Sequence, residues 1–183
     1  MRIIGGDLRS RLIKGPPSSL ARPTRDRVRE AVFNMVGGQC RGARVLDLFA
    51  GTGAYGLESL SRGAESCVFV EKDPVCSGII EVNISALGVS ERSKLEKSSA
   101  EKYLSSLAGK HVKYDMIFMD PPYGFYAVKN ILIMVERYDI LSASGMLIAE
   151  HGARESAPGS EGAISIYKQK SYGITSVSIY IKK

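Results

Sequence analysis

The feature that most constrains the fold is a three-part repeat that begins after Gly42: an apolar segment, a turn with glycine or proline, and an amphipathic helix. Strands that alternate with helices form a parallel sheet covered by helices on both faces. The sequence therefore predicts an α/β fold. The expected strands cover residues 44–49, 66–71, 94–98, 114–119 and 145–150, and the expected helices cover residues 54–62, 74–87, 100–107 and 127–138.

The C-terminal segments depart from this repeat. Residues 163–169 and 175–181 have no helix between them and are joined through Tyr172-Gly173. This pattern indicates an antiparallel hairpin at the edge of the sheet. Because 183 residues typically form one domain, we expect residues 41–183 to fold as a single unit around a mostly parallel sheet of seven strands.

The N-terminal segments form an extension, residues 1–40, that precedes this unit. Residues 2–5 and 8–13 are expected to pair as a small β-hairpin. After a loop rich in glycine, proline and serine, a helix with Thr24 as its N-cap is expected to end at Gly37-Gly38.

Basic residues are concentrated in this extension. The net charge of the whole chain is +6, but the segment that ends at Arg44 carries +7 and the remainder −1. Such a field raises the rate of encounter with polyanions, above all phosphate backbones, although a merely soluble surface has the same composition. The candidate phosphate contacts are Arg9, Arg11, Lys14, Arg22, Arg25 and Arg29, the last placed with Arg25 on an exposed helix face.

Composition excludes several classes of protein. The apolar runs are far shorter than the roughly 20 residues that a membrane span requires, and no apolar signal core follows Arg2. The three cysteines contain no CxxC pair, and His111 and His151 have no neighbours at metal-ligand spacing. We therefore expect a cytoplasmic protein with reduced thiols, no membrane contact and no metal site.

The first strand runs into a glycine-rich turn, residues 50–56. Gly51, Gly53 and Gly56 satisfy the GxGxxG spacing of dinucleotide sites, and Glu71 follows the next strand, where a carboxylate accepts hydrogen bonds from ribose hydroxyls. Asp47, at the end of the strand, would repel a pyrophosphate. It suits a ligand with a positive group, such as the amino acid part of S-adenosylmethionine.

A second motif, Asp120-Pro121-Pro122-Tyr123, follows the apolar residues 116–119. Prolines cannot continue a central strand, so Asp120 and the Pro121 carbonyl are expected at the carboxyl end of the sheet, where ligands bind. The two acceptors can hold the hydrogens of an aryl amine and favour a pyramidal nitrogen, while Tyr123 stacks on the base. This tetrad resembles the signature of methyltransferases that act on exocyclic amino groups.

Together these motifs resemble one family. Five parts of the chain are similar to bacterial RsmD-type methyltransferases: Met1–Gly6, the Arg-Pro-Thr-Arg segment at residues 22–25, residues 46–53, the Asp-Pro-Pro-Tyr tetrad and residues 172–175. The resemblance implies a Rossmann-like class I fold and methyl transfer from S-adenosylmethionine to the N2 amine of a guanine in small-subunit (16S) ribosomal RNA. It further implies action on that RNA or on the assembling 30S subunit, as a monomer.

The resemblance also assigns the site. The catalytic residues are Asp120, Pro121, Pro122 and Tyr123, and the cofactor residues are Asp47, Phe49, Ala50, Gly51, Gly53, Glu71, Lys72, Ser99, Ala100 and Asp120. Ser99 stands where the family has an acidic residue, so a hydroxyl or backbone group would bind the adenine amine. The alternatives are a DNA adenine-N6 methyltransferase, a glutamine-modifying protein methyltransferase, a nicotinamide-dependent oxidoreductase that uses the GxGxxG turn, and a non-catalytic RNA-binding module.

Overall fold

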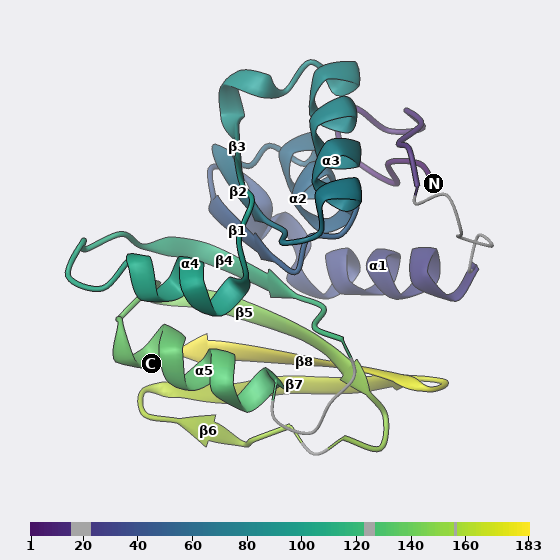
Figure 1. The fold of residues 1–183 in the computed structure, drawn as a ribbon. Coiled ribbons are helices and arrows are strands. Elements are labelled where there is room, and N and C mark those ends of the chain that lie inside the picture. Colours follow the sequence, from purple (N-terminus) through teal and green to yellow (C-terminus); the bar gives the residue numbers. More distant parts are fainter. Residues whose placement is uncertain (16–22, 123–126, 156) are drawn as a thin grey trace.

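The protein is described here by a computed structural model that covers residues 1–15, 23–122, 127–155 and 157–183. Its strands are β1 (Arg44–Leu48), β2 (Ser66–Val70), β3 (Ser93–Glu96), β4 (Tyr114–Met119), β5 (Leu141–Gly152), β6 (Ser160–Glu161), β7 (Ile164–Tyr172) and β8 (Thr175–Lys182). Within the described residues these eight strands form one sheet in the order β3-β2-β1-β4-β5-β8-β7-β6 (Figure 1). The first five in that order are parallel, and β8, β7 and β6 are antiparallel.

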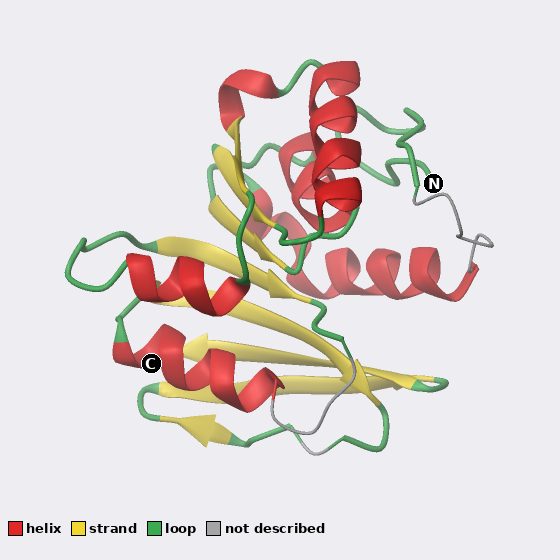
Figure 2. Ribbon diagram, viewed as in Figure 1, coloured by secondary structure: helices red, strands yellow, loops and turns green. Residues whose placement is uncertain are grey.

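Helices cover both faces of the sheet (Figure 2). They are α1 (Pro23–Val36), η1 (Gly37–Cys40), α2 (Ala54–Ser61), α3 (Pro74–Leu87), η2 (Ser90–Arg92), α4 (Ala100–Ser106) and α5 (Ala127–Arg137). On one face, α1, α2 and α3 pack with Phe69 and Phe118. On the other face, α4 and α5 pack with Leu46 and Ile117. Successive residues of a strand point to opposite faces, so the apolar strands supply both cores.

This architecture confirms the predicted Rossmann-like α/β class with its antiparallel C-terminal edge. The sheet has one strand more than the seven predicted, because the two-residue strand β6 pairs with β7. Strand β5 also begins at Leu141, four residues earlier than predicted. None of the helices in the described residues is long and apolar enough to cross a membrane.

The N-terminal extension differs from its prediction in two details. Residues 2–5 and 8–13 run antiparallel, but they form one bridge, Arg2 to Leu12, instead of two strands. The reason is that the backbone N–H groups of Ile4 and Gly5 are taken by the Glu58 carboxylate of α2, at 2.8 Å each. The second correction concerns α1, which begins at Pro23, so Thr24 lies within the helix and is not its N-cap.

The extension also packs into the core of the sheet. Ile3, Ile13 and Phe33 are buried in the same apolar cluster as Val45 of β1. Figure 1 shows the N-terminus beside α1 and α3, on the face opposite α4 and α5. The described residues of the extension therefore pack against the same sheet.

Candidate active site

A cavity of about 530 Å³ opens at the carboxyl ends of the parallel strands. This edge is where open α/β sheets bind their ligands, because the loops after successive strands converge there. The cavity is lined by Phe49, Gly51, Val70, Glu71, Lys72, Ser98, Ser99, Ala100, Glu101, Asp120, Pro121, Pro122, Glu150, Ile174 and Thr175.

The glycine turn after β1 contributes Gly51 to the lining of this cavity. Gly53 precedes α2 with φ +80°, a left-handed conformation that favours glycine. Gly56 serves a different purpose, since a Cβ there would lie 2.3 Å from the Phe69 ring and 2.6 Å from the Cys67 sulfur. The two glycines thus let α2 start sharply and pack closely on β2.

Glu71, the residue after β2, links the end of that strand to the glycine turn by hydrogen bonds. One carboxylate oxygen accepts a hydrogen bond from the Gly51 N–H at 2.8 Å, and the other accepts one from the Asp73 N–H at 2.8 Å. A carboxylate offers about four lone-pair sites, so it can accept further hydrogen bonds from a ligand in the cavity that it lines. Glu71 is therefore both an anchor of the glycine turn and a candidate ribose acceptor.

Asp47 lies behind the turn, outside the lining of the cavity. Its carboxylate is 2% exposed and accepts a hydrogen bond from the Gly56 N–H at 2.9 Å. Burial raises the pKa of Asp47 to about 8; the Gly56 hydrogen bond opposes this shift, and the charges of Asp120 and Glu71 add to it. Three carboxyl groups thus act on one another at this edge, an environment that favours a cationic ligand.

Asp120, Pro121 and Pro122 line the cavity at the end of β4, as the tetrad predicts. Pro121 is buried and Pro122 is exposed. This placement sets Asp120 and the proline segment on the wall of the same cavity that Gly51 lines. Tyr123, the fourth catalytic candidate, lies outside the described residues.

The loop after β3 also lines the cavity. The Ser99 hydroxyl caps α4, where it accepts a hydrogen bond from the Lys102 N–H at 3.2 Å. Ser98 and Glu101 line the cavity on either side of the Ser99-Ala100 pair. Glu101 is an acid that the sequence did not predict for this site, because it lies two residues after Ser99 in the first turn of α4, where acidic residues are common for reasons of helix stability alone.

The cavity thus brings together most of the predicted site. Three of the predicted cofactor residues do not line the cavity: Asp47, Ala50 and Gly53. The residues missed by the prediction are Val70, Ser98, Glu101, Glu150, Ile174 and Thr175. The last two follow the Tyr172-Gly173 turn of the β7–β8 hairpin, a segment whose place at the cavity depends on the tertiary fold. Among the described residues, no group of three or more histidine, cysteine or acidic side chains could hold a metal ion.

The predicted phosphate contacts divide into two groups. Arg9, Arg11 and Lys14 are exposed in the extension, and one Arg11 N–H donates to the Ala86 carbonyl at 2.8 Å. Arg22 lies outside the described residues, as does the side chain of Arg25. The assignment of Arg29 to an exposed, phosphate-binding face is wrong, because its side chain is 3% exposed.

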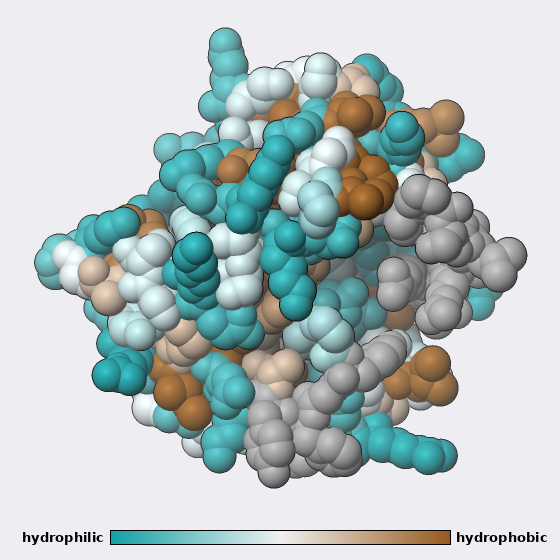
Figure 3. Space-filling view, in the orientation of Figure 1, coloured by the Kyte–Doolittle hydropathy of each residue, from teal (hydrophilic) through white to brown (hydrophobic). Residues whose placement is uncertain are grey.

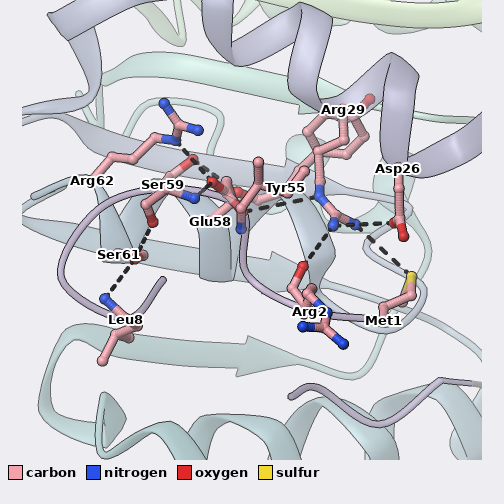
Figure 4. A network of polar contacts seen from close by, with 12 residues as sticks. Met1, Arg2, Leu8, Asp26, Arg29, Tyr55, Glu58, Ser59, Ser61 and Arg62 are labelled. Carbon is pink, nitrogen blue, oxygen red and sulfur yellow. Dashed lines mark hydrogen bonds and ion pairs between the residues drawn. The ribbon is translucent and has the colours of Figure 1, made fainter. Parts of the chain in front are cut away.

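Arg29 is buried because α2 supplies a buried partner, Glu58 (Figure 4). The Arg29 guanidinium also donates to the Arg2 carbonyl at 2.8 Å and pairs with Asp26 at 3.2 Å. Glu58 in turn accepts from Arg62 at 2.9 Å and from the backbone of the extension. This network fixes the extension to α2, so the buried Arg29 has a structural role in holding the extension.

The outer surface around these elements is mainly hydrophilic. On the face shown in Figure 3, the hydrophobic side chains occupy small, separate areas among polar ones. Ile174, 75% exposed, is the most exposed of the large apolar residues in the described chain, and it lies at the rim of the cavity.

Comparisons with known proteins identify the family of this chain. The model of the family described as conserved hypothetical protein 95 matches residues 1–181. A relative named putative rRNA methyltransferase YlbH, from Bacillus subtilis, is 36% identical over 183 residues and covers all of both chains. Ribosomal RNA small subunit methyltransferase D of Escherichia coli is 32% identical over 180 residues, which are 98% of this chain and 89% of that protein.

Solved structures show the same likeness. A structure described as putative methyltransferase yhhF from Escherichia coli superposes with a TM-score of 0.88 at 31% identity, and the match covers 100% of this chain and 98% of that one. The family match spans both the extension and the sheet, including every predicted site residue. The chain therefore belongs to the conserved hypothetical protein 95 family, the RsmD family of methyltransferases.

Proposed function

We propose that this protein transfers a methyl group from S-adenosylmethionine to the exocyclic N2 amine of a guanine in small-subunit (16S) ribosomal RNA. The observation that carries the proposal is the placement of Asp120 and Pro121 on the wall of the cavity that Glu71 and the glycine turn also line. The names of the relatives, which refer to ribosomal RNA and its small subunit, support the same substrate. We further propose that the enzyme acts in the cytoplasm as a monomer.

The residues at the cavity fit S-adenosylmethionine. Its sulfonium and amino groups are cationic. The buried carboxyl of Asp47 lies near the carboxyl groups of Asp120 and Glu71, and no basic group contributes to the shift of its pKa. Glu71 would accept from the ribose, and the loop of Ser98 to Glu101 would surround the adenine. When bound, the cofactor supplies an electrophilic methyl group.

The chain itself must orient the nucleophile. The lone pair of an aryl amine is delocalised into the ring, so the amine is a poor nucleophile until its hydrogens are held out of the base plane. The Asp120 carboxylate and the Pro121 carbonyl are two acceptors that can do this. Little strong-base catalysis is then required, because the same Asp120 acceptor can take the proton that the methylated amine releases.

The basic extension is proposed to hold the RNA, with residues 1–40 as the RNA-contacting part and residues 41–183 as the methyltransferase part. The backbone of one exposed basic residue, Lys14, lies close to the glycine turn, since Asn83 of α3 accepts from the Lys14 N–H at 2.7 Å and donates to the Thr52 carbonyl at 3.1 Å. Lys14 is thereby tied to the glycine turn. A phosphate backbone bound along the extension would present its bases toward the cavity.

Methyl transfer from tritiated S-adenosylmethionine to small subunits that lack the modification, followed by nucleoside mapping, tests the reaction. Parallel assays on naked RNA and on DNA separate the substrates. Asp120→Ala is expected to abolish transfer while the cofactor dissociation constant stays within about tenfold, or 1.4 kcal/mol. Glu91→Gln, a neutralised carboxylate on the exposed η2, is the matched control. Full activity of Asp120→Ala, or label found only in adenine, contradicts the proposal.

Replacement of Arg9, Arg11 and Lys14 together by alanine tests the RNA contact. Each neutralised phosphate contact changes the log–log salt slope of binding by about 0.7 to 0.9, so the slope should flatten by up to about two units. Affinity should fall uniformly across RNA sequences, with unchanged cofactor binding. A triple variant with the affinity and salt slope of the wild type would limit the extension to a structural role.

A further inference from the structure

A second carboxylate, Glu150, lies beside Asp120 in the cavity. Strands β4 and β5 are parallel and pair Phe118 with Ile148 and Met119 with Ala149. One step further along the same register places Asp120 next to Glu150, and both residues line the cavity. The reaction proposed above uses only Asp120 and leaves the adjacent carboxylate without a function.

The Glu150 carboxylate is held in place by a tyrosine. The Tyr55 hydroxyl of α2 donates to one carboxylate oxygen of Glu150 at 2.8 Å, and the Tyr55 ring stacks on Phe118 with 5.1 Å between ring centroids. Burial, followed by the charge of Glu150, raises the pKa of Tyr55 well above its ordinary value. Tyr55 therefore remains a proton donor, and its rigid ring fixes the direction in which Glu150 presents acceptors.

An oriented carboxylate next to the two acceptors of the amine, Asp120 and Pro121, is complementary to the hydrogen-bonding edge of guanine. Guanine carries its N2 amine and its N1–H side by side, so both are donors, whereas N1 of adenine is an acceptor. Enzymes that flip a base read such edges by hydrogen bonds. An ionised carboxylate only accepts, so it pairs with a donor and repels an acceptor.

We propose that Glu150 accepts the N1–H of the target guanine while Asp120 and Pro121 hold its N2 amine, so that Glu150 determines specificity for guanine. This inference rests on the proposed function. It also explains how a site with the Asp-Pro-Pro-Tyr tetrad, which an adenine-N6 enzyme shares, selects the other purine. Tyr55 is then a positioning residue, which acts through Glu150.

The test compares guanine with 2-aminopurine at the nucleotide that the mapping identifies, in reconstituted small subunits. The analogue keeps the amine but has an acceptor in place of N1–H. Wild type should prefer guanine in kcat/KM by about 10- to 100-fold, the range of one charge-assisted hydrogen bond. In Glu150→Gln the side-chain amide can donate to N1 of the analogue, so this preference should fall toward unity.

Two further variants make the result decisive. Tyr55→Phe keeps the Glu150 charge but removes its anchor, and it should lower the preference to an intermediate value; it carries the test if Glu150→Gln does not fold. Glu91→Gln on exposed η2 should retain the preference of the wild type. A preference unchanged in both site variants overturns the role of Glu150 while leaving the proposed function intact. A wild type that methylates no guanine overturns both.

Discussion

The buried carboxyl of Asp47 makes the stability of this protein depend on pH in an unusual direction. Burial raises its pKa from 3.8 to about 8 in the folded protein. A carboxyl with a raised pKa favours the folded state while it is protonated. Its contribution is therefore fully present below the unfolded pKa of 3.8 and is lost as the pH rises through about 8.

The size of the effect follows from the linkage between proton binding and folding. At pH 6 the folded carboxyl retains its proton and the unfolded one has lost it. The free energy of unfolding then falls by about 1.4 kcal/mol per pH unit until the pH nears the folded pKa. Integrated from pH 6 to pH 8, Asp47 should remove about 2 kcal/mol of stability.

Urea denaturation of wild type and Asp47→Asn at pH 6, 7 and 8 measures this effect. Asparagine keeps an oxygen that can accept from the Gly56 N–H, but it does not titrate. The free energy of unfolding of the variant minus that of the wild type should thus increase by about 2 kcal/mol between pH 6 and 8. Titrating groups that do not interact with Asp47 cancel in this difference. A difference that stays constant over that range would refute the argument.

Three other substitutions test the anchors of the site and of the extension. Glu71→Gln should weaken S-adenosylmethionine by about 1.5–3 kcal/mol in isothermal titration, because a charge-assisted bond is lost; unchanged affinity would make Glu71 only an anchor of the turn. Glu58→Gln should lower the free energy of unfolding by about 1.5–3 kcal/mol in chemical denaturation, because Arg29 and Arg62 lose a buried counter-charge while Asp26 still pairs with Arg29, and a loss below about 1 kcal/mol would contradict this. Gly6→Ala should cost about 1–3 kcal/mol, because its Cβ would lie 1.9 Å from the Ser61 carbonyl oxygen, whereas Gly37→Ala, with a positive φ but open space, should cost less in the same assay.

Local periodicity was sufficient to predict the sheet and most of its helices. The helix at residues 74–87 and the strand at residues 114–119 have the predicted bounds, because an N-cap at Asp73 and the prolines after Met119 are local signals. Strand β5 begins four residues early because its pairing with β4 continues through an irregularity between Tyr114 and Met116. Such an irregularity depends on the neighbouring strand and leaves no mark in the segment itself.

The parts of the site that were missed depend on contacts between distant residues. Arg29 occupies a polar position of an amphipathic helix, and only the docking of α2 places Glu58, which is 0% exposed, beside it. Glu150 is similar, because its polarity at the end of an apolar strand was visible but its neighbour Asp120 lies 30 residues earlier. Sequence spacing predicts which strand ends carry polar residues. It does not predict which of them face the same cavity.

The distribution of charge decides between ligands that the glycine spacing leaves equivalent. A GxGxxG turn accommodates a pyrophosphate or an adenosyl sulfonium, but the carboxyl groups of Glu71, Asp120 and Glu150 line the same cavity at this edge of the sheet. Their field repels a pyrophosphate and attracts a cation. The same field would repel a phosphate backbone, which the proposed RNA contacts of the basic extension would attract. A target nucleotide is therefore expected to keep its phosphates on the extension and to insert only its uncharged base, which requires that the base leave its stack before the amine reaches Asp120.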